Sequence, residues 1–372
     1  MLIGIDGNEA NQKRRVGIGQ VAFNVLLRLE KIDKKNKYII YLKDQPLLDL
    51  PKEREGWRYK VFGPKKLWTQ VALPIRLFTQ REKLDLFFTP SHYAPRFSPF
   101  PTVIYIMDLW HHRHPEQFSS RDLYQLTKWE SYSIKNAKHV LTISEFSKSE
   151  IMNIYHLSED KVTVAYPGFD RFEIKNQMSK TKAIMKKYKI NGDYLLYIGT
   201  LQPKKNLVRL VEAFGEVKKK YPQILLVLAG KRGWLYDEIF AKVKELGMED
   251  KVIFTGFIDE EDKAPLLAGA KAFVFPSLYE GFGIPVLEAM SLRTPAVVAK
   301  AGSLPEVGGD AAIYCDPYSI ESISKAIEKA LGLNKKERDA IIARGMRQTE
   351  KFSWEKCARE VLETFALITD NQ

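Results

Sequence analysis

The chain has 372 residues, 45% hydrophobic and 12% aromatic, so it can bury two ordinary cores and is not a disordered protein. No apolar run reaches the roughly 20 residues of a membrane span, and Met1 to Asp6 reads as a strand instead of a signal peptide. The only cysteines, Cys315 and Cys357, lack metal-ligand spacing, which fits a reducing compartment. We therefore expect a cytoplasmic protein.

The net charge of +12 indicates a partner with negative charge: a phosphorylated ligand, an anionic membrane or a nucleic acid. Basic residues cluster at Lys13 to Arg15, Lys34 to Lys37 and Lys65 to Lys66. The segment 65–78 adds Trp68 and an apolar stripe, which predicts either a helix packed on its own sheet or one that rests on a membrane. Nucleic acid is not expected, because aromatic and basic residues do not interleave.

In chain order, the first half alternates short apolar runs with helical patterns, which predicts a doubly wound α/β domain. The expected strands are Leu2 to Ile5, Tyr38 to Leu42, Tyr59 to Phe62, Leu86 to Thr89, Val103 to Ile106, Val140 to Ile143 and Val162 to Ala165. After Gly19, the apolar residues Val21, Val25, Leu26 and Leu29 predict a helix with one buried face. We place the domain boundary in the lysine-rich stretch 175–189 that follows Gly168, with a first domain of 1–172.

The second half repeats the alternation, which predicts a second Rossmann-like domain over 173–354. Its expected strands are Tyr194 to Ile198, Leu225 to Ala229, Val252 to Thr255, Ala272 to Phe275, Ala296 to Ala299 and Ala312 to Tyr314. A last helix begins at Phe352 to Trp354 and runs to about Ile368. A nicotinamide-dependent dehydrogenase is not favoured, because residues 4–10 lack the G-x-G-x-x-G fingerprint.

The stretch from Glu280 to Glu288 places two carboxylates around a glycine-rich turn that leads into a helix. The amides of Gly281, Phe282 and Gly283 would face the carboxyl end of the sheet, where phosphate binds in open α/β folds. Glu288, expected in the first helical turn, can accept hydrogen bonds from a ribose diol, and Glu280 can hold the transferred sugar. The alternative is a solvated loop acid and an ordinary acid at a helix start.

Several segments resemble the motifs of retaining GT-B glycosyltransferases of family 4. Phe273 to Gly302 resembles the donor-binding glutamate-x7-glutamate motif, and Gly199-Thr-Leu-Gln-Pro-Lys-Lys-Asn206 the second phosphate-binding turn. The remaining likenesses are Gly17-Ile-Gly19 to the amino-terminal glycine loop, Asp108 to Pro115 to the acceptor-side loop, and Val140 to Ser147 with Tyr166 to Gly168 to the interdomain approach.

The resemblance implies a fold, a domain organisation and a reaction. The fold would be GT-B: two Rossmann-like doubly wound domains facing across a cleft, with helix 355–372 packing back on the acceptor-binding domain 1–172. The domain 173–354 would bind a nucleotide sugar. The reaction would be a retaining, metal-independent hexosyl transfer that needs no cofactor, with departure and attack on the same face of the sugar.

By the same resemblance, Lys205 balances charge on the leaving diphosphate, while Gly17 and Gly19 either bind phosphate or only cap their helix. Thr200 departs from the family pattern, because many relatives carry an arginine there. The resemblance implies these donor-binding residues: Gly17, Gly19, Gly199, Thr200, Lys205, Gly230, Lys231, Phe257, Ile258, Gly281, Phe282, Gly283, Ile284, Leu287 and Glu288.

The acceptor-side loop carries Asp108, His111 and His112, and we expect Asp108 to act with Glu280 in catalysis. Relatives often have a histidine immediately before this aspartate, where this chain has Met107, so His111 or His112 is a possible substitute on the acceptor side. The alternative for Asp108 is a helix cap. The histidine spacing matches no usual zinc site, so we expect no metal.

Segments 67–118 look most like bacterial mannosyltransferases of polysaccharide assembly. The leading hypothesis is therefore a transferase that moves mannose from GDP-mannose to a glycan or lipid-linked acceptor, with peripheral contact to the inner face of an anionic membrane. Alternatives are a UDP-glucose or other UDP-sugar donor, or a nucleotide-sugar-binding protein whose catalysis is impaired, as Met107 and Thr200 could indicate.

Overall fold

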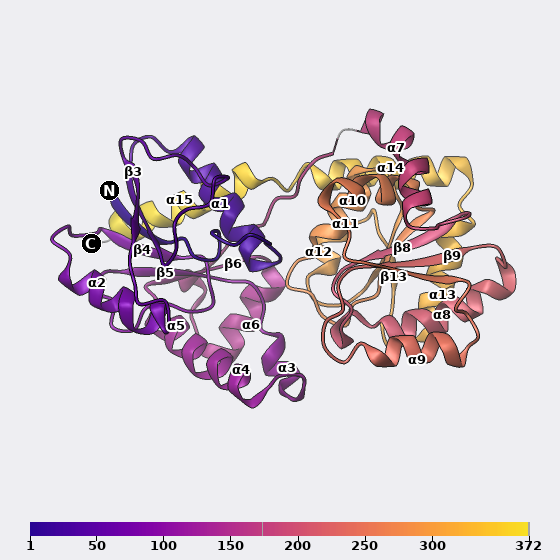
Figure 1. Cartoon of the computed structure of the whole chain (residues 1–372), viewed down its shortest axis with the longest axis horizontal. Coiled ribbons are helices and arrows are strands. Elements are labelled where there is room, and N and C mark those ends of the chain that lie inside the picture. Colours follow the sequence, from indigo (N-terminus) through magenta and orange to yellow (C-terminus); the bar gives the residue numbers. More distant parts are fainter. Residues whose placement is uncertain (173, 371–372) are drawn as a thin grey trace. The chain divides into compact units, whose positions relative to one another are not determined.

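The computed structural model describes residues 1–172 and 174–370, and the side chains of 174–179 and 370 are outside the description. Its contacts divide the chain into two units (Figure 1). Unit 1 contains Met1–Gly168 and Phe352–Gln372, and unit 2 contains Phe169–Lys351. Residue 173, where the second domain was predicted to begin, and residues 371–372 of the predicted last helix lie outside the described residues.

Unit 1 is built around a parallel sheet with the order β3-β2-β1-β4-β5-β6-β7. Its strands are β1 (Leu2–Asp6), β2 (Lys37–Leu42), β3 (Trp57–Val61), β4 (Leu86–Thr89), β5 (Thr102–Ile106), β6 (His139–Thr142) and β7 (Val162–Val164). Its helices are α1 (Ile18–Ile32), α2 (Leu73–Thr79), α3 (Trp110–Arg113), α4 (Ser120–Tyr124), α5 (Glu130–Asn136), α6 (Glu145–Tyr155) and α15 (Trp354–Asp370). Short helical turns are η1 (Trp68–Ala72), η2 (Pro115–Gln117), η3 (Gln125–Trp129) and η4 (Glu159–Lys161).

Unit 2 is built around a second parallel sheet, with the order β10-β9-β8-β11-β12-β13. Its strands are β8 (Tyr194–Ile198), β9 (Leu225–Ala229), β10 (Val252–Gly256), β11 (Ala272–Phe275), β12 (Ala296–Ala299) and β13 (Ile313–Cys315). Its helices are α7 (Ile174–Lys187), α8 (Leu207–Lys220), α9 (Asp237–Glu245), α10 (Glu260–Gly269), α11 (Ile284–Ser291), α12 (Leu304–Gly308), α13 (Ile320–Leu331) and α14 (Lys335–Thr349), with the short turn η5 (Pro203–Lys205).

Both sheets confirm the predicted doubly wound α/β class, and each has one point where the strand order reverses. In unit 1 this point lies between β1 and β4, and in unit 2 between β8 and β11. The connections that follow two such neighbouring strands run to opposite faces of the sheet. A crevice therefore opens between their loops at the carboxyl edge, and ligands bind there. The two reversal points therefore mark the places where sites are expected.

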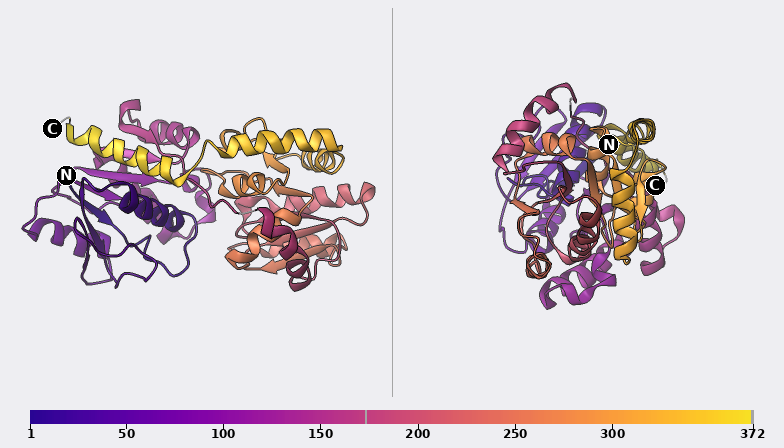
Figure 2. Two further views of the ribbon diagram at one scale, coloured as in Figure 1. Left: turned by 90° about the horizontal axis from the view of Figure 1, so that it is seen from above. Right: turned by 90° about the vertical axis from the view of Figure 1, so that its right-hand side faces the viewer.

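The predicted amphipathic stripe after Gly19 is the buried face of α1, and α15 packs against α1 in unit 1 (Figure 2). The rings of Phe88 in β4 and Phe365 in α15 lie 5.2 Å apart, edge to face. The last helix thus completes the core of the unit that contains the first residues of the chain.

The lysine-rich stretch 175–189 does not contain the domain boundary that was predicted there. Most of it forms α7, which packs on α10 within unit 2. The contacts instead divide the chain between Gly168 and Phe169. The lysines misled the prediction because their polar character resembles a linker even when one face of a helix is packed.

The segment 65–78 has two apolar faces, and the prediction that it packs on its own sheet is confirmed. One face, containing Trp68, Ala72, Leu73 and Leu77, is buried in the core of unit 1. The other exposes Leu67, Val71, Ile75 and Phe78. Among the described residues, no helix combines the length and apolar character needed to cross a bilayer.

Candidate active site

Lys205 and Glu280, both predicted from the sequence, form an ion pair at the reversal point of the unit 2 sheet. Lys205 follows β8 and Glu280 follows β11, and the Nζ of Lys205 lies 2.5 Å from Oε1 of Glu280. Both side chains are largely buried. A charged pair held out of water makes strong, orientable contacts with a polar ligand, because solvent screens it weakly.

The turn that carries Glu280 is fixed by its surroundings. Ser303 Oγ donates hydrogen bonds to the carbonyl oxygens of Glu280 at 2.9 Å and Phe282 at 2.8 Å. Gly283 caps α11 with a φ of 120°, a value that L side chains rarely adopt, so a glycine is required there. These contacts fix the conformation of the turn that carries Glu280.

The Lys205 side of the pair is anchored in the same way. Asn206 is buried, and its Nδ2 donates to the carbonyl oxygens of Pro276 at 3.0 Å and Pro317 at 2.6 Å. The amide of Leu278 donates to the carbonyl of Lys204 at 2.9 Å, which ties the loop after β11 to the loop after β8.

Glu288 lies on α11 with a partner that the sequence did not indicate. Its carboxylate is 2% exposed, and Lys263 on α10 places Nζ 2.5 Å from Oε1. Within the described part of the chain, Oε2 is buried and has no hydrogen-bond partner. Burial raises the pKa of Glu288, and the charge and hydrogen bond of Lys263 oppose this shift. An unpaired buried carboxylate oxygen is a strong acceptor for a ligand hydroxyl.

The expectation that Glu288 stands in the first turn of its helix is wrong. The helix begins at Ile284 with Pro285 near its start, and it has no acidic residue in the first turn. Glu288 is the fifth residue of α11, so the helix dipole contributes little to its charge. The cation that stabilises the charge of Glu288 is Lys263.

The other predicted donor residues follow the carboxyl ends of β8, β9, β10 and β11, which are consecutive in the sheet. Gly230 approaches the preceding loop so closely that a Cβ would lie 1.9 Å from the carbonyl oxygen of Gly199. The carbonyl oxygen of Thr200 accepts a hydrogen bond from the hydroxyl of Tyr197. The remaining predicted residues differ in burial: Lys231 and Phe257 are exposed, Ile284 is half-buried, and Ile258, Gly281 and Leu287 are buried.

Gly17 and Gly19 belong to unit 1 and stand at the start of α1. Gly17 is the N-cap residue, with a φ of 52° and an exposed backbone, and makes no side-chain cap. Gly19 packs close to the carbonyl of Glu9. Both the phosphate-loop reading and the helix-cap reading are compatible with this arrangement.

Asp108 follows β5, and its Oδ1 accepts a hydrogen bond from the amide of Trp110 at 3.2 Å. The cap residue of α3 is Leu109 and no side chain caps this helix, so the structure does not bear out the helix-cap alternative for Asp108. His111 is buried, and its Nε2 lies 3.3 Å from Oε1 of Glu130. The Nε2 of His112 lies 2.9 Å from the hydroxyl of Tyr155. Both predicted acceptor-side histidines therefore have contacts inside unit 1.

Glu130 is the centre of a polar network that the sequence analysis missed. It is 0% exposed, its Oε2 lies 2.7 Å from Nδ1 of His92, and its Oε1 accepts a hydrogen bond from Tyr155 at 3.0 Å. Burial raises the pKa of Glu130, but bonds and charges from His111 and His92 outweigh it, so its pKa lies below the ordinary value. The signal that could have found His92 is its place three residues after the strand Leu86–Thr89.

One group of side chains has the composition of a metal site. His111, His112 and Glu130 offer ligand atoms that all lie within 4.8 Å of one another. Tetrahedral zinc ligands lie at about 2.0–2.2 Å from the metal, so this group would have to contract around an ion. In the described structure Glu130 and His112 already form hydrogen bonds with His92 and Tyr155, and the group reads as a hydrogen-bond network.

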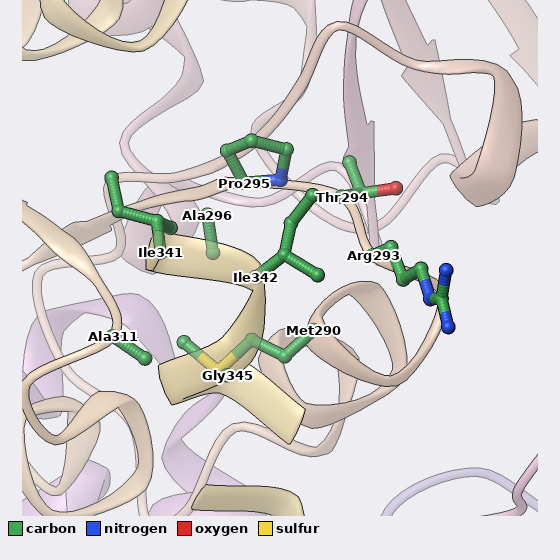
Figure 3. A pocket seen from close by; sticks show the side chains of 9 residues that line it. All are labelled: Met290, Arg293, Thr294, Pro295, Ala296, Ala311, Ile341, Ile342 and Gly345. Carbon is green, nitrogen blue, oxygen red and sulfur yellow. The ribbon is translucent and has the colours of Figure 1, made fainter. Parts of the chain in front are cut away.

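A small hollow in unit 2 lies away from these residues (Figure 3). It is enclosed by α11, α14 and the residues that lead into the amino-terminal end of β12, whereas Glu280 and Lys205 follow the carboxyl ends of their strands. Its lining is mostly apolar and consists of Met290, Arg293, Thr294, Pro295, Ala296, Ala311, Ile341, Ile342 and Gly345. We do not assign it to the active site.

Two named proteins are similar in sequence to this chain over part of their length. O-antigen chain mannosyltransferase B of Escherichia coli is 36% identical over 241 residues, which cover 63% of this chain and 62% of that protein. O-antigen chain mannosyltransferase RfbU of Salmonella typhimurium is 32% identical over 198 residues, covering 53% of this chain and 52% of that protein. The chain thus spans between half and two thirds of these two relatives.

A solved structure shares the fold over nearly the whole chain. Anabaena Alr3699/HepE, crystallised with UDP and glucose, superposes with a TM-score of 0.72 at 19% identity and covers 98% of this chain and 99% of its own. At this identity the likeness establishes the fold alone.

Two family descriptions match consecutive parts of the chain. Residues 17–171 match Glycosyltransferase Family 4, and residues 180–348 match Glycosyl transferases group 1. The two matches correspond closely to the two Rossmann-like units described above. Together the two matches cover most of the chain, which therefore combines an amino-terminal part from Glycosyltransferase Family 4 with a carboxyl-terminal part from Glycosyl transferases group 1.

Proposed function

We propose that the protein is a retaining, metal-independent glycosyltransferase that moves mannose from GDP-mannose to a glycan or lipid-linked acceptor in cell-surface polysaccharide biosynthesis. The carrying observation is the preformed set of Lys205, Glu280 and Glu288 at the reversal point of the unit 2 sheet. It offers one cation and two carboxylates, which are the groups needed for a diphosphate, a hexose and a ribose.

The three side chains have separate tasks in this proposal. The unpaired Oε2 of Glu288 accepts a hydrogen bond from a ribose hydroxyl. Lys205 turns from Glu280 toward the diphosphate and stabilises the charge that develops on the leaving nucleotide. Glu280 then holds hydroxyls of the hexose and stabilises positive charge at the anomeric carbon.

The chemical step breaks the bond between the anomeric carbon and the phosphate oxygen while the acceptor oxygen bonds to the same face of that carbon. The proton of the acceptor hydroxyl passes to the departing phosphate oxygen. No protein carboxylate forms a covalent bond in this step, so the distance rules for paired glycosidase carboxylates do not apply to Glu280 and Glu288.

Mannose as the transferred sugar is supported by the likeness to two O-antigen mannosyltransferases. A UDP-sugar is the alternative, since the structural relative was solved with UDP and glucose. A binding protein with impaired catalysis is the second alternative.

Nucleotide release from a panel of GDP- and UDP-sugars, with and without EDTA, separates these functions. We expect release of GDP from GDP-mannose that survives EDTA. Release from a UDP-sugar only would correct the donor. Binding without turnover would identify the impaired protein, and activity that EDTA abolishes and a divalent cation restores would contradict metal independence.

Contact with an anionic membrane is a further part of the proposal. The exposed apolar face of the segment 67–78 adjoins the exposed cations at its start, a combination suited to an interface where apolar side chains enter and lysines meet lipid phosphates. The residues are Lys65, Lys66, Leu67, Val71, Ile75 and Phe78.

Sedimentation with vesicles tests this contact. Wild type should co-sediment with vesicles containing phosphatidylglycerol and less with neutral ones, and Val71→Glu with Ile75→Glu should abolish binding. Leu48→Glu is the matched control, because Leu48 is a fully exposed leucine elsewhere in unit 1. Equal binding by all three proteins would exclude this face.

A further inference from the structure

His92 occupies the same topological place in unit 1 that Lys205 and Glu280 occupy in unit 2. The strand order of the unit 1 sheet reverses between β1 and β4. Glu9 follows β1 by three residues, and His92 follows β4 by three residues. Asp108 follows the next strand, β5. These three side chains therefore emerge at the crevice where an open α/β sheet binds ligands.

The carboxylate of Glu130 holds the imidazole of His92 in one orientation. Its Nδ1 lies 2.7 Å from the fully buried Oε2 of Glu130, and the other oxygen of Glu130 is held by Tyr155. The side chain of His92 keeps 20% of its exposure. Because Nδ1 is engaged with Glu130, the opposite ring nitrogen, Nε2, is the polar atom left for another partner; no hydrogen bond to it occurs within residues 1–172 and 174–370.

The buried pair is difficult to explain by stability alone. Burying a carboxylate against an imidazole removes charge from water, and apolar residues of the same volume are often as stable or more so. Buried ionisable pairs at crevices are more typical of functional sites. The pair is best explained as a support that fixes Nε2 of His92.

The charges around His92 indicate the class of ligand. Glu9 and Asp108 are both partly exposed, and both lie near enough for their charges to act on His92. Two carboxylates beside one imidazole would repel a phosphate. Hydroxyl groups instead can accept from an imidazole N–H and donate to carboxylates, so the set suits a neutral polyhydroxyl compound.

We propose that His92, positioned by Glu130, forms with Glu9 and Asp108 the binding site for a neutral sugar residue of the acceptor. This inference rests on the proposed function, because a transferase needs an acceptor saccharide as well as a donor. His92 contacts the acceptor, and Glu130 is a positioning residue that acts through His92.

Saccharide binding in the absence of donor tests the site. The probes are the methyl glycosides of mannose, glucose, galactose and N-acetylglucosamine, observed by saturation-transfer NMR with the full chain. We expect at least one glycoside to bind the wild type and His92→Gln to weaken it by about tenfold or more, the loss of one good hydrogen bond. His114→Gln is the control, since His114 is partly exposed in the same unit and pairs with Glu116.

The second measurement separates an acceptor role from a donor role. In His92→Gln and in Glu130→Gln, the KM for an added glycoside should rise by a larger factor than the KM for the donor, which is measured as nucleotide release without acceptor. A purely structural role of Glu130 would lower both reactions in parallel, with a lower melting temperature.

Three results would overturn the assignment. They are glycoside binding unaffected by His92→Gln, no glycoside binding to the wild type, and inorganic phosphate that binds to His92 more tightly than any glycoside. Failure of the proposed function is a different result, in which no nucleotide sugar is turned over although the glycosides still bind through His92.

Discussion

The ammonium group of Lys263 on α10 lies 2.5 Å from Oε1 of Glu288 on α11, while Oε2 of the same carboxylate has no partner among the described residues. The lysine thus occupies one oxygen, and the proposed function assigns the other to a ribose hydroxyl. Burial lowers the pKa of Lys263, but the charges of Glu288 and Glu260 outweigh it and the pKa rises, so the lysine stays charged.

Lys263→Met should therefore weaken donor binding and change its pH dependence. Burial already raises the pKa of Glu288, and removing the cation that opposes this shift raises it further. An ionised Glu288 is present above its pKa and lost as the pH falls through it. We expect the acidic limb of a profile of donor KM against pH to move toward neutral pH in the variant.

Lys325→Met is the matched control, since Lys325 pairs with Glu321 on an exposed helix face of the same unit. A profile of Lys263→Met that overlays the wild type would show that Lys263 does not govern the charge of Glu288. The charged groups that act on Glu288 are Lys263, Glu260 and Asp170.

The two glutamates should respond differently to removal. Glu288→Ala removes a ground-state contact to ribose and should raise the donor KM with a smaller change in kcat. Glu280→Ala removes a group that acts at the reacting carbon and should lower kcat by about 100-fold. Steady-state kinetics with saturating acceptor measures both, and equal effects on KM and kcat in the two variants would contradict the division.

The Lys205 and Glu280 pair should be visible in stability without any ligand. Lys205→Met leaves a largely buried carboxylate unpaired, which costs about 3 kcal/mol in the free energy of unfolding. The double variant Lys205→Met with Glu280→Gln should recover much of that loss, because the buried charge is gone. Urea unfolding of the four proteins of this cycle gives the coupling, and additive losses would indicate that the two residues act separately.

Gly230 should not tolerate a side chain. A Cβ at this position would meet the carbonyl oxygen of Gly199 at 1.9 Å, and the φ of 151° also disfavours it. Gly230→Ala should lower the free energy of unfolding by about 3 kcal/mol and weaken donor binding. Gly247→Ala is a useful comparison, because it has a positive φ but no atom within 4 Å of the added Cβ. Similar losses in both would assign the effect to backbone strain alone.

The sheets, and the position of Glu280 after a strand, were predictable from the sequence, since buried parallel strands produce continuous apolar runs. The predicted strand Leu86 to Thr89 has the bounds of β4, whereas the one predicted at Ala312 to Tyr314 begins and ends one residue later. Such ends depend on which amides pair across the sheet, and apolar composition does not record that pairing.

The partners of the site residues were not predictable in the same way. Lys263 stands in a run of charged residues, Asp259 to Lys263, that looks like the solvated start of a helix. Only the packing of α10 against α11 turns it toward Glu288. Similarly, Glu130 and His92 are 38 residues apart in the sequence, and they meet only because α5 packs against the loop after β4.

The return of the chain to unit 1 has a consequence for synthesis on the ribosome. Unit 2 is one continuous segment, Phe169–Lys351, and can fold as soon as it has emerged. Unit 1 has all its strands before unit 2, but α15, which packs on α1 and places Phe365 against Phe88, comes after unit 2 in the chain. The unit that begins the sequence can therefore complete its core only after all of unit 2 has been translated, and the face of α1 that α15 packs on stays uncovered until then.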